Sequence, residues 1–368
     1  MLRMPLVVLF FSLAVPVLAQ VAPAPDAPPS ANAGGPLRTI KPQAPEHSPA
    51  PVSVAPQIPP SQPLATLRVR TNLVNVFFIV RDSHRHLVQN LQKSDCTVLE
   101  DNVPQTLKSF SNRPDLPLTL GVLLDTSLSQ QNVLATEKRA GDAFLRAILK
   151  PKDEAFLMSF DVNVDLLADL TGSLHTLEQA MNGAGINSSS GNYANGTIPS
   201  IGKPKGTVLY DAVYLATHDT LRDQAGRKAL VLLTDGQDEG SQESLKSAIE
   251  AAQKADAIVY VLLISDPGPY GMLDFSGAAP IHKLAKETGG TVFEIGHNGR
   301  KMQAAFTTIE KELRQEYEVT YTPTNRAQDG AYRRIHVDCR QNGTPLHVRA
   351  REGYYALQSG KTTSPSDR

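Results

Sequence analysis

The segment GVLLDTSLSQQ, residues 121–131, joins an aliphatic stretch to a polar one. Its first four residues are typical of a strand that is buried on both faces. Three oxygen-bearing side chains then follow at alternate positions, namely Asp125, Ser127 and Ser129. Two interpretations fit this spacing. One is a turn with helix-capping residues, because Asp and Ser are common in both, and the other is a metal site with oxygen ligands.

The sequence around this segment alternates between aliphatic runs and segments of helical periodicity. The aliphatic runs predict strands at 118–125, 155–160, 228–236, 257–265 and 291–296. The periodic segments predict helices at 132–149, 173–184, 207–221, 243–255, 279–290 and 300–316. Apolar strands that alternate with helices indicate a mostly parallel sheet covered by helices on both faces. Right-handed crossovers then give a doubly wound α/β fold.

The flanks of this α/β region, residues 64–115 and 323–356, carry strand patterns without a helical period. We expect them to pack together as one small β module built from both flanks. A further strand pattern at 317–323 can extend the edge of the α/β sheet. Each flank holds one cysteine, Cys96 or Cys339. In an oxidising compartment the two can form a disulfide, and the alternative is two buried free thiols.

The first residues predict export from the cytoplasm to the periplasm or the extracellular space. Residues 1–19 contain a short basic start, an apolar run and small residues up to Ala19, as in a secretory signal cleaved after that position. The alternative is a membrane anchor, but the run is shorter than the ~20 residues that span a bilayer. Residues 20–63 hold 13 of the 27 prolines and predict an extended linker. Residues 357–368 are a polar tail, and no later segment is apolar enough to span a membrane.

A second strand end has the same character as the first. The run LLTDG places Asp235 directly after aliphatic residues, and Thr207 opens a predicted helix after the loop GKPKG. Ligands of open α/β sheets bind at the carboxyl ends of strands, so all of these positions can lie on one rim. Two carboxylates and three hydroxyls, with no Cys or His nearby in sequence, favour Mg²⁺, Mn²⁺ or Ca²⁺ over zinc. Two carboxylates neutralise such an ion and leave room for waters or for an acidic side chain of a partner protein.

Taken in order, these segments resemble the metal-ion-dependent adhesion site of von Willebrand factor A (VWA) domains. The matching segments are Asp125-Thr126-Ser127-Leu128-Ser129, Gly206-Thr207 and Thr234-Asp235-Gly236. The resemblance covers about residues 116–322 and implies a mostly parallel sheet with one antiparallel edge strand, flanked by helices. It also implies that Asp125, Ser127, Ser129 and Thr207 are ligands, with Asp235 bound directly or through water.

The rest of the chain extends this resemblance and shows one departure from it. The flanks are similar to those of exported bacterial members of the family, notably from Acidobacteria. Many members carry a small residue at the position of Leu128. In this chain the larger leucine side chain would lie beside the ion.

Three functions fit these expectations. The first is an exported protein-binding module in which a divalent cation, most simply Mg²⁺, bridges to a carboxylate of a partner protein. The second is a metal-dependent hydrolase, but we expect no enzyme because GxxxxGK[ST], GxSxG and HExxH motifs are all missing from the sequence. The third is a structural component of the cell envelope. The net charge of −1 gives no general attraction to nucleic acid, and the oligomeric state cannot be read from these residues.

Overall fold

A computed structural model describes residues 73–112, 115–186, 206–264 and 277–358, which all belong to the unit Arg68–Arg368. The predicted signal segment, the proline-rich linker and all but two residues of the predicted tail lie outside the described residues. No helix in the described ranges is long and apolar enough to cross a membrane.

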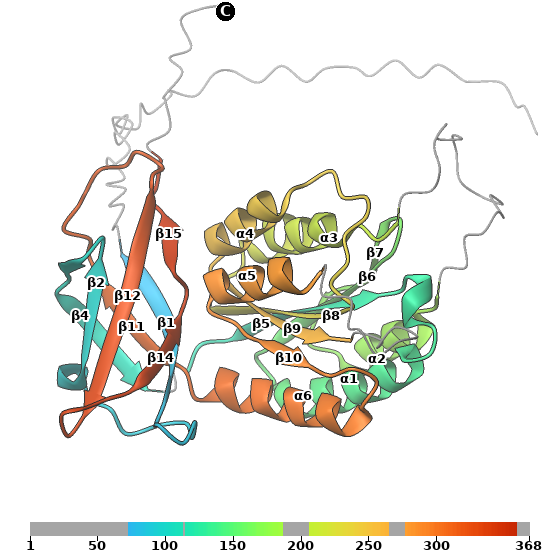
Figure 1. The fold of residues 1–368 in the computed structure, drawn as a ribbon, viewed down its shortest axis with the longest axis horizontal. Helices are drawn as coiled ribbons and strands as arrows, with labels where there is room; N and C mark the ends of the chain where they lie inside the picture. The colour runs from blue at the N-terminus through green and yellow to red at the C-terminus, as the bar shows by residue number, and fades with distance from the viewer. Residues whose placement is uncertain (1–72, 113–114, 187–205, 265–276, 359–368) are drawn as a thin grey trace, which may run out of the picture. The chain divides into compact units, whose positions relative to one another are not determined.

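The central element is a six-stranded sheet with the order β10-β9-β8-β5-β6-β7 (Figure 1). Its strands are β5 (Leu118–Asp125), β6 (Glu154–Phe160), β7 (Val164–Thr171), β8 (Arg227–Thr234), β9 (Ala257–Leu263) and β10 (Val292–Glu294). Neighbouring strands are parallel except for β7, which pairs antiparallel with β6. All eight residues of β5 are buried, because it lies between β6 and β8 and is covered on both faces.

Helices cover both faces of this sheet (Figure 1). The apolar residues of α1 (Leu134–Ile148), α2 (Leu174–Gly183) and α6 (Gly299–Arg314) form one buried core with the sheet. Those of α3 (Leu209–Leu215), α4 (Leu245–Lys254) and α5 (Ala278–Thr288) form a second core on the other face. The predicted doubly wound, mostly parallel α/β fold is therefore confirmed.

Strand β7 was missed by the sequence analysis. Its burial pattern alternates irregularly between exposed and half-buried positions, because it is the edge strand of the sheet. A strand in this position lacks the continuous aliphatic run that marks β5, β8 and β9. β7 supplies the single antiparallel edge strand that the VWA resemblance implies.

The predicted β module is also confirmed, and both flanks contribute to it (Figure 1). One sheet has the order β14-β1-β11-β4, and the other has the order β13-β12-β2-β3 with β15 paired to β12. The N-terminal flank gives β1 (Val74–Arg81), β2 (Cys96–Glu100), β3 (Val103–Pro104) and β4 (Leu107–Asn112). The C-terminal part gives β11 (Tyr317–Tyr321), β12 (Tyr332–Gln341), β13 (Thr344–Pro345), β14 (His347–Ala350) and β15 (Gly353–Tyr355).

Strand β11 does not extend the α/β sheet, so that expectation was wrong. It pairs antiparallel with β1 and β4 inside the module. Tyr317, Val319 and Tyr321 alternate with less buried residues and point into the apolar core of the module. The chain enters β11 directly after α6, so the C-terminal part of the module begins at Tyr317 rather than at the predicted 323.

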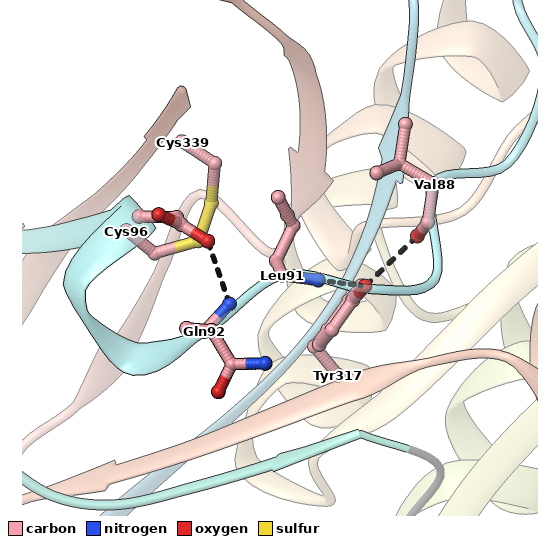
Figure 2. Close-up of a disulfide and its surroundings, with 7 residues drawn as sticks. Val88, Leu91, Gln92, Cys96, Tyr317 and Cys339 are labelled. Carbon is pink, nitrogen blue, oxygen red and sulfur yellow. Dashed lines mark hydrogen bonds between the residues drawn. A yellow bond between two sulfur atoms is a disulfide. The ribbon is translucent and has the colours of Figure 1, made fainter. Parts of the chain in front are cut away.

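A disulfide joins Cys96 on β2 to Cys339 on β12 (Figure 2). The two residues face each other in the antiparallel register of these strands, although 243 positions separate them in sequence. Beside them the Tyr317 hydroxyl donates to the carbonyl of Val88 at 3.0 Å and accepts from the amide of Leu91 at 3.2 Å (Figure 2). The disulfide therefore ties the N-terminal flank to the C-terminal strands across the module.

Candidate metal centre

The candidate site lies where β5 and β8 end. These strands are parallel neighbours with Leu124 opposite Leu233, so Asp125 and the loop after Thr234 emerge at the same edge of the sheet. β6 follows β5 in sequence and lies on one side of it in the sheet, whereas the later strands β8, β9 and β10 lie on the other side. The strand order therefore reverses at β5. The carboxyl edge at such a reversal is where open α/β sheets bind ligands.

Four of the five predicted residues form a continuous chain of side-chain oxygens at short distances from one another. The Ser127 hydroxyl donates to Asp125 Oδ1 at 2.5 Å. The Ser127 and Ser129 hydroxyls lie 2.9 Å apart, and Ser129 Oγ donates to Asp235 Oδ2 at 2.7 Å. The structure thus brings side chains from the ends of two strands, 106 or more residues apart in sequence, into direct contact.

The local backbone explains why these side chains converge. Asp125 Oδ1 also accepts from the Ser127 amide at 3.0 Å, which forms an Asx-type turn at the end of β5. A short 3₁₀ turn, Leu128–Gln130, follows, and Ser127 at its start makes no side-chain capping bond. The turn interpretation is therefore correct for the backbone. The serine hydroxyls nevertheless face the carboxylates rather than the ends of a helix.

Asp125 is fully buried, and a second hydroxyl reaches its other oxygen. Thr234 Oγ1 donates to Asp125 Oδ2 at 2.7 Å. Burial raises the pKa of Asp125 to about 7, the hydrogen bonds from Ser127 and Thr234 oppose this shift, and repulsion from Asp235 adds to it. In the described part of the chain, neither Asp125 nor Asp235 has an ion-pair partner. Two neighbouring carboxylates without a basic partner suit a divalent cation.

Thr207 lies at the same edge, but backbone hydrogen bonds rather than bonds of its side chain hold it there. Its carbonyl accepts from the Glu239 amide at 2.9 Å, and the next amide, of Val208, donates to the carbonyl of Asp161 at 2.7 Å. Helix α3 begins at Leu209 with Val208 at the N-cap, so Thr207 precedes the capping position. Among the described residues, no hydrogen bond joins the Thr207 hydroxyl to the other four side chains.

The residues present fit a hard divalent cation. Within the described ranges, no three His, Cys, Asp or Glu side chains come close enough together to hold a metal ion. The oxygens gathered at this edge are those of two carboxylates and of neutral hydroxyl groups. Such a donor set matches Mg²⁺, Mn²⁺ or Ca²⁺ and lacks the nitrogen and sulfur ligands that zinc prefers.

Sequence reasoning missed three residues of this region. Thr234 holds Asp125, and its position at the end of an aliphatic run, beside Asp235, was an available signal. Gln130 donates to Ser129 Oγ at 3.2 Å and is buried. Glu137 is buried on α1, at the position that continues the apolar series of Gly141, Phe144 and Ile148. An acidic residue at a core position of a helical period was the signal for Glu137.

Comparisons with known proteins concern the fold of this chain. No protein-family model and no curated protein sequence matches it. An aerotolerance-related membrane protein from Bacteroides fragilis is 18% identical and matches 53% of this chain and 98% of its own, with a TM-score of 0.41. The vWF domain of the pili tip protein Mfa5 from Porphyromonas gingivalis is 12% identical, with coverages of 53% and 94% and a TM-score of 0.37.

A third similar structure is that of proximal thread matrix protein 1 from the mussel byssus. In that structure the metal-ion-dependent adhesion site (MIDAS) motif is occupied by zinc. It is 13% identical, with coverages of 56% and 47% and a TM-score of 0.41. At these identities and TM-scores, the similarities carry no argument about the site or the function of this chain. The description of this fold as VWA-like is based on the strand order of the chain and on its antiparallel edge strand β7.

Proposed function

We propose that this chain is an exported member of the VWA family that binds a partner protein through a divalent cation. Asp125, Ser127, Ser129 and Thr207 would hold the ion, with Asp235 bound directly or through water. The ion would accept a carboxylate of the partner as a further ligand. The observation that carries the proposal is the chain of oxygens from Asp125 to Asp235, which has no basic partner among the described residues.

The chemistry of the donor set supports the bridging role. Mg²⁺ takes six oxygen ligands and usually keeps several waters, which an outside carboxylate can replace. Two protein carboxylates balance the charge of the ion but do not fill its coordination sphere. A partner carboxylate would therefore bind to an ion that is held firmly on one side only, and Mg²⁺ is the cation we propose, with Mn²⁺ and Ca²⁺ as substitutes.

The contacts of the two serines favour binding over catalysis. In the described structure, Ser127 donates to Asp125, and Ser129 donates to Asp235 and accepts from Gln130. The two serine hydroxyl oxygens lie 2.9 Å apart. Neither contacts a histidine or lysine that could act as a general base for a serine nucleophile. We therefore propose no enzymatic activity for this site.

Titration calorimetry of the purified protein with Mg²⁺ tests metal binding. We expect one site in the wild type and loss of binding in Asp125→Asn, which keeps the shape of the buried side chain and removes its charge. Asp165→Asn is the matched control, because Asp165 is an exposed aspartate on the edge strand β7. Equal Mg²⁺ affinity in the wild type and in Asp125→Asn would refute the proposal.

Partner capture with and without a chelator tests the bridging role. We expect a bound protein that EDTA releases and that Asp125→Asn does not retain. Identical sets of captured proteins under both conditions would favour the alternative of a structural envelope component.

A further inference from the structure

Two buried polar side chains near the candidate ligands have side-chain oxygens without a hydrogen-bond partner among the described residues. Gln130 is 1% exposed and Glu137 is 0% exposed. Gln130 Oε1 and both carboxylate oxygens of Glu137 have no hydrogen-bond partner among the described residues. A buried acceptor without a donor or a cation costs free energy, so three such oxygens in one region call for an explanation.

Both side chains belong to the segment that leads from the ligand loop into α1. The Val133 amide donates to the Gln130 carbonyl at 3.0 Å, and the Glu137 amide donates to the Val133 carbonyl at 3.0 Å. Glu137 lies seven residues before Phe144 in α1, so both side chains are on the helix face that packs against the sheet. Gln130 precedes α1, and its Nε2 donates to Ser129 Oγ at 3.2 Å, so Gln130 contacts a candidate ligand directly.

The surroundings of Glu137 connect it to Asp125. Burial raises the pKa of Glu137 to about 8, and repulsion from the Asp125 carboxylate raises it further. No ion pair with a basic side chain compensates Glu137 within the described ranges. Glu137 also does not complete a cluster of three acidic side chains close enough to hold an ion directly. It therefore lies near the candidate ligands without being one of them.

We infer that Glu137 is a positioning residue of the metal centre. It acts on Asp125 through its charge, and Gln130 acts on Ser129 through a hydrogen bond. This inference rests on the proposed function. With a cation bound, an ionised Glu137 would add a third negative charge nearby without contacting the ion, and Gln130 orients the Ser129 hydroxyl. Groups that support metal ligands from behind in this way typically change metal affinity 10- to 100-fold when they are replaced.

The alternative is a neutral glutamic acid packed in the core with no relation to the ion. The two interpretations differ in what Glu137→Gln does. If Glu137 supports the ion, the substitution weakens Mg²⁺ binding. It also raises the melting temperature of the metal-free protein, because it removes a buried acid that nothing compensates there. If Glu137 is only structural, Mg²⁺ affinity does not depend on it.

The experiment measures Mg²⁺ affinity by calorimetry and melting temperature with and without Mg²⁺, using the full chain. We expect Glu137→Gln to raise the Kd about tenfold and to reduce the increase in melting temperature caused by Mg²⁺. Glu137→Asp keeps the charge and should fall between the wild type and Glu137→Gln. Gln130→Met leaves Glu137 in place and should also raise the Kd, because Ser129 loses the hydrogen bond that Gln130 donates to it.

Glu316→Gln is the matched control. Glu316 is also a buried glutamate with an unpartnered oxygen, but its ionic neighbour Arg227 is at the first residue of β8, the opposite end from the candidate site. We expect its Kd for Mg²⁺ to stay within twofold of the wild type. A wild type that binds Mg²⁺ with the same Kd as Glu137→Gln and Gln130→Met would overturn this inference alone. A wild type that does not bind Mg²⁺ would overturn the proposed function as well.

Discussion

At the scale of single residues, the candidate site depends on a carboxylate that the fold places out of water. Asp125 is the last residue of a fully buried strand, and hydroxyls from Ser127 and Thr234 occupy its two oxygens. Hydrogen bonds of this kind stabilise the charged form of a carboxylate, whereas burial opposes it. A positive charge close to Asp125 would therefore favour its ionised form, which is the form that binds a metal ion.

Thr207 is the candidate ligand that most needs a direct test, because only its backbone is tied to the site. Thr207→Val keeps the shape of the side chain and removes the hydroxyl. If that hydroxyl binds the ion, the substitution should raise the Kd for Mg²⁺ at least about tenfold. Calorimetry gives the Kd, and the melting temperature without metal should be almost unchanged. An unchanged Kd would remove Thr207 from the ligand set.

Glu316 predicts a pH dependence of stability that does not involve the metal. Burial raises its pKa to about 8 from an ordinary value of 4.5, against the opposing effect of Arg227. The folded protein therefore holds a proton that the unfolded chain releases between about pH 4.5 and pH 8, so this group lowers the free energy of unfolding as pH rises through that window.

Urea denaturation of the wild type and Glu316→Gln, without metal, measures the effect of this acid. Glutamine cannot ionise, so the variant should gain stability relative to the wild type at pH 8.5 and differ little at pH 5. The same stability difference at both pH values would show that Glu316 does not titrate in this way.

At the scale of elements, the predictable parts of the fold are those with burial on both faces. β5, β8 and β9 are continuous aliphatic runs because both of their faces are covered, and their acidic ends therefore stand out. β7 has no such run, and the alternating pattern of β11 does not show which sheet it joins. Strand existence follows from local sequence, whereas strand partners depend on contacts between distant segments.

The candidate site also contains residues that local sequence predicts and residues that it does not. Asp125 and Asp235 were predictable because each ends an aliphatic strand, and the strand order brings the two ends together. Gln130 and Glu137 were not singled out, because polar residues near the start of a helix are usually exposed or act as caps. The helical period of α1 was a signal for the burial of Glu137, whereas the burial of Gln130 follows only from the structure.

The disulfide between β2 and β12 is expected to stabilise the module without affecting the metal centre. The double variant Cys96→Ser with Cys339→Ser opens a link between residues 243 positions apart. Loss of a native disulfide typically costs about 2–5 kcal/mol, so the urea midpoint should fall. Mg²⁺ affinity should remain the same, because the candidate ligands belong to the α/β sheet. An unchanged urea midpoint would show that the disulfide contributes little stability.

At the scale of the whole molecule, the β module contains the segments that enter and leave the α/β region. β4 leads into β5, and α6 leads into β11. Glu312 on α6 binds Arg81 of β1 and Arg349 of β14, which are neighbouring strands of the module. These connections lie at the amino end of β5. The candidate site lies at its carboxyl end, which an eight-residue strand places about 23 Å away.

This separation supports separate roles that we propose for the two parts of the described chain. The module and its disulfide would stabilise the ends of the α/β region, and residues 20–63 would act as a spacer. The carboxyl edge of the sheet would then be free to meet a partner. The partner-binding role that we propose depends on a cation at that edge.

A crystal structure of the protein grown with Mn²⁺, with anomalous diffraction recorded, is the most direct test. Mn²⁺ prefers the same oxygen ligands as Mg²⁺, and its anomalous signal identifies it. We predict a single strong anomalous peak beside the proposed ligands, which are Asp125, Ser127, Ser129, Thr207 and Asp235. A crystal that shows no peak there, while Asp125 and Ser127 keep their positions, would contradict the account.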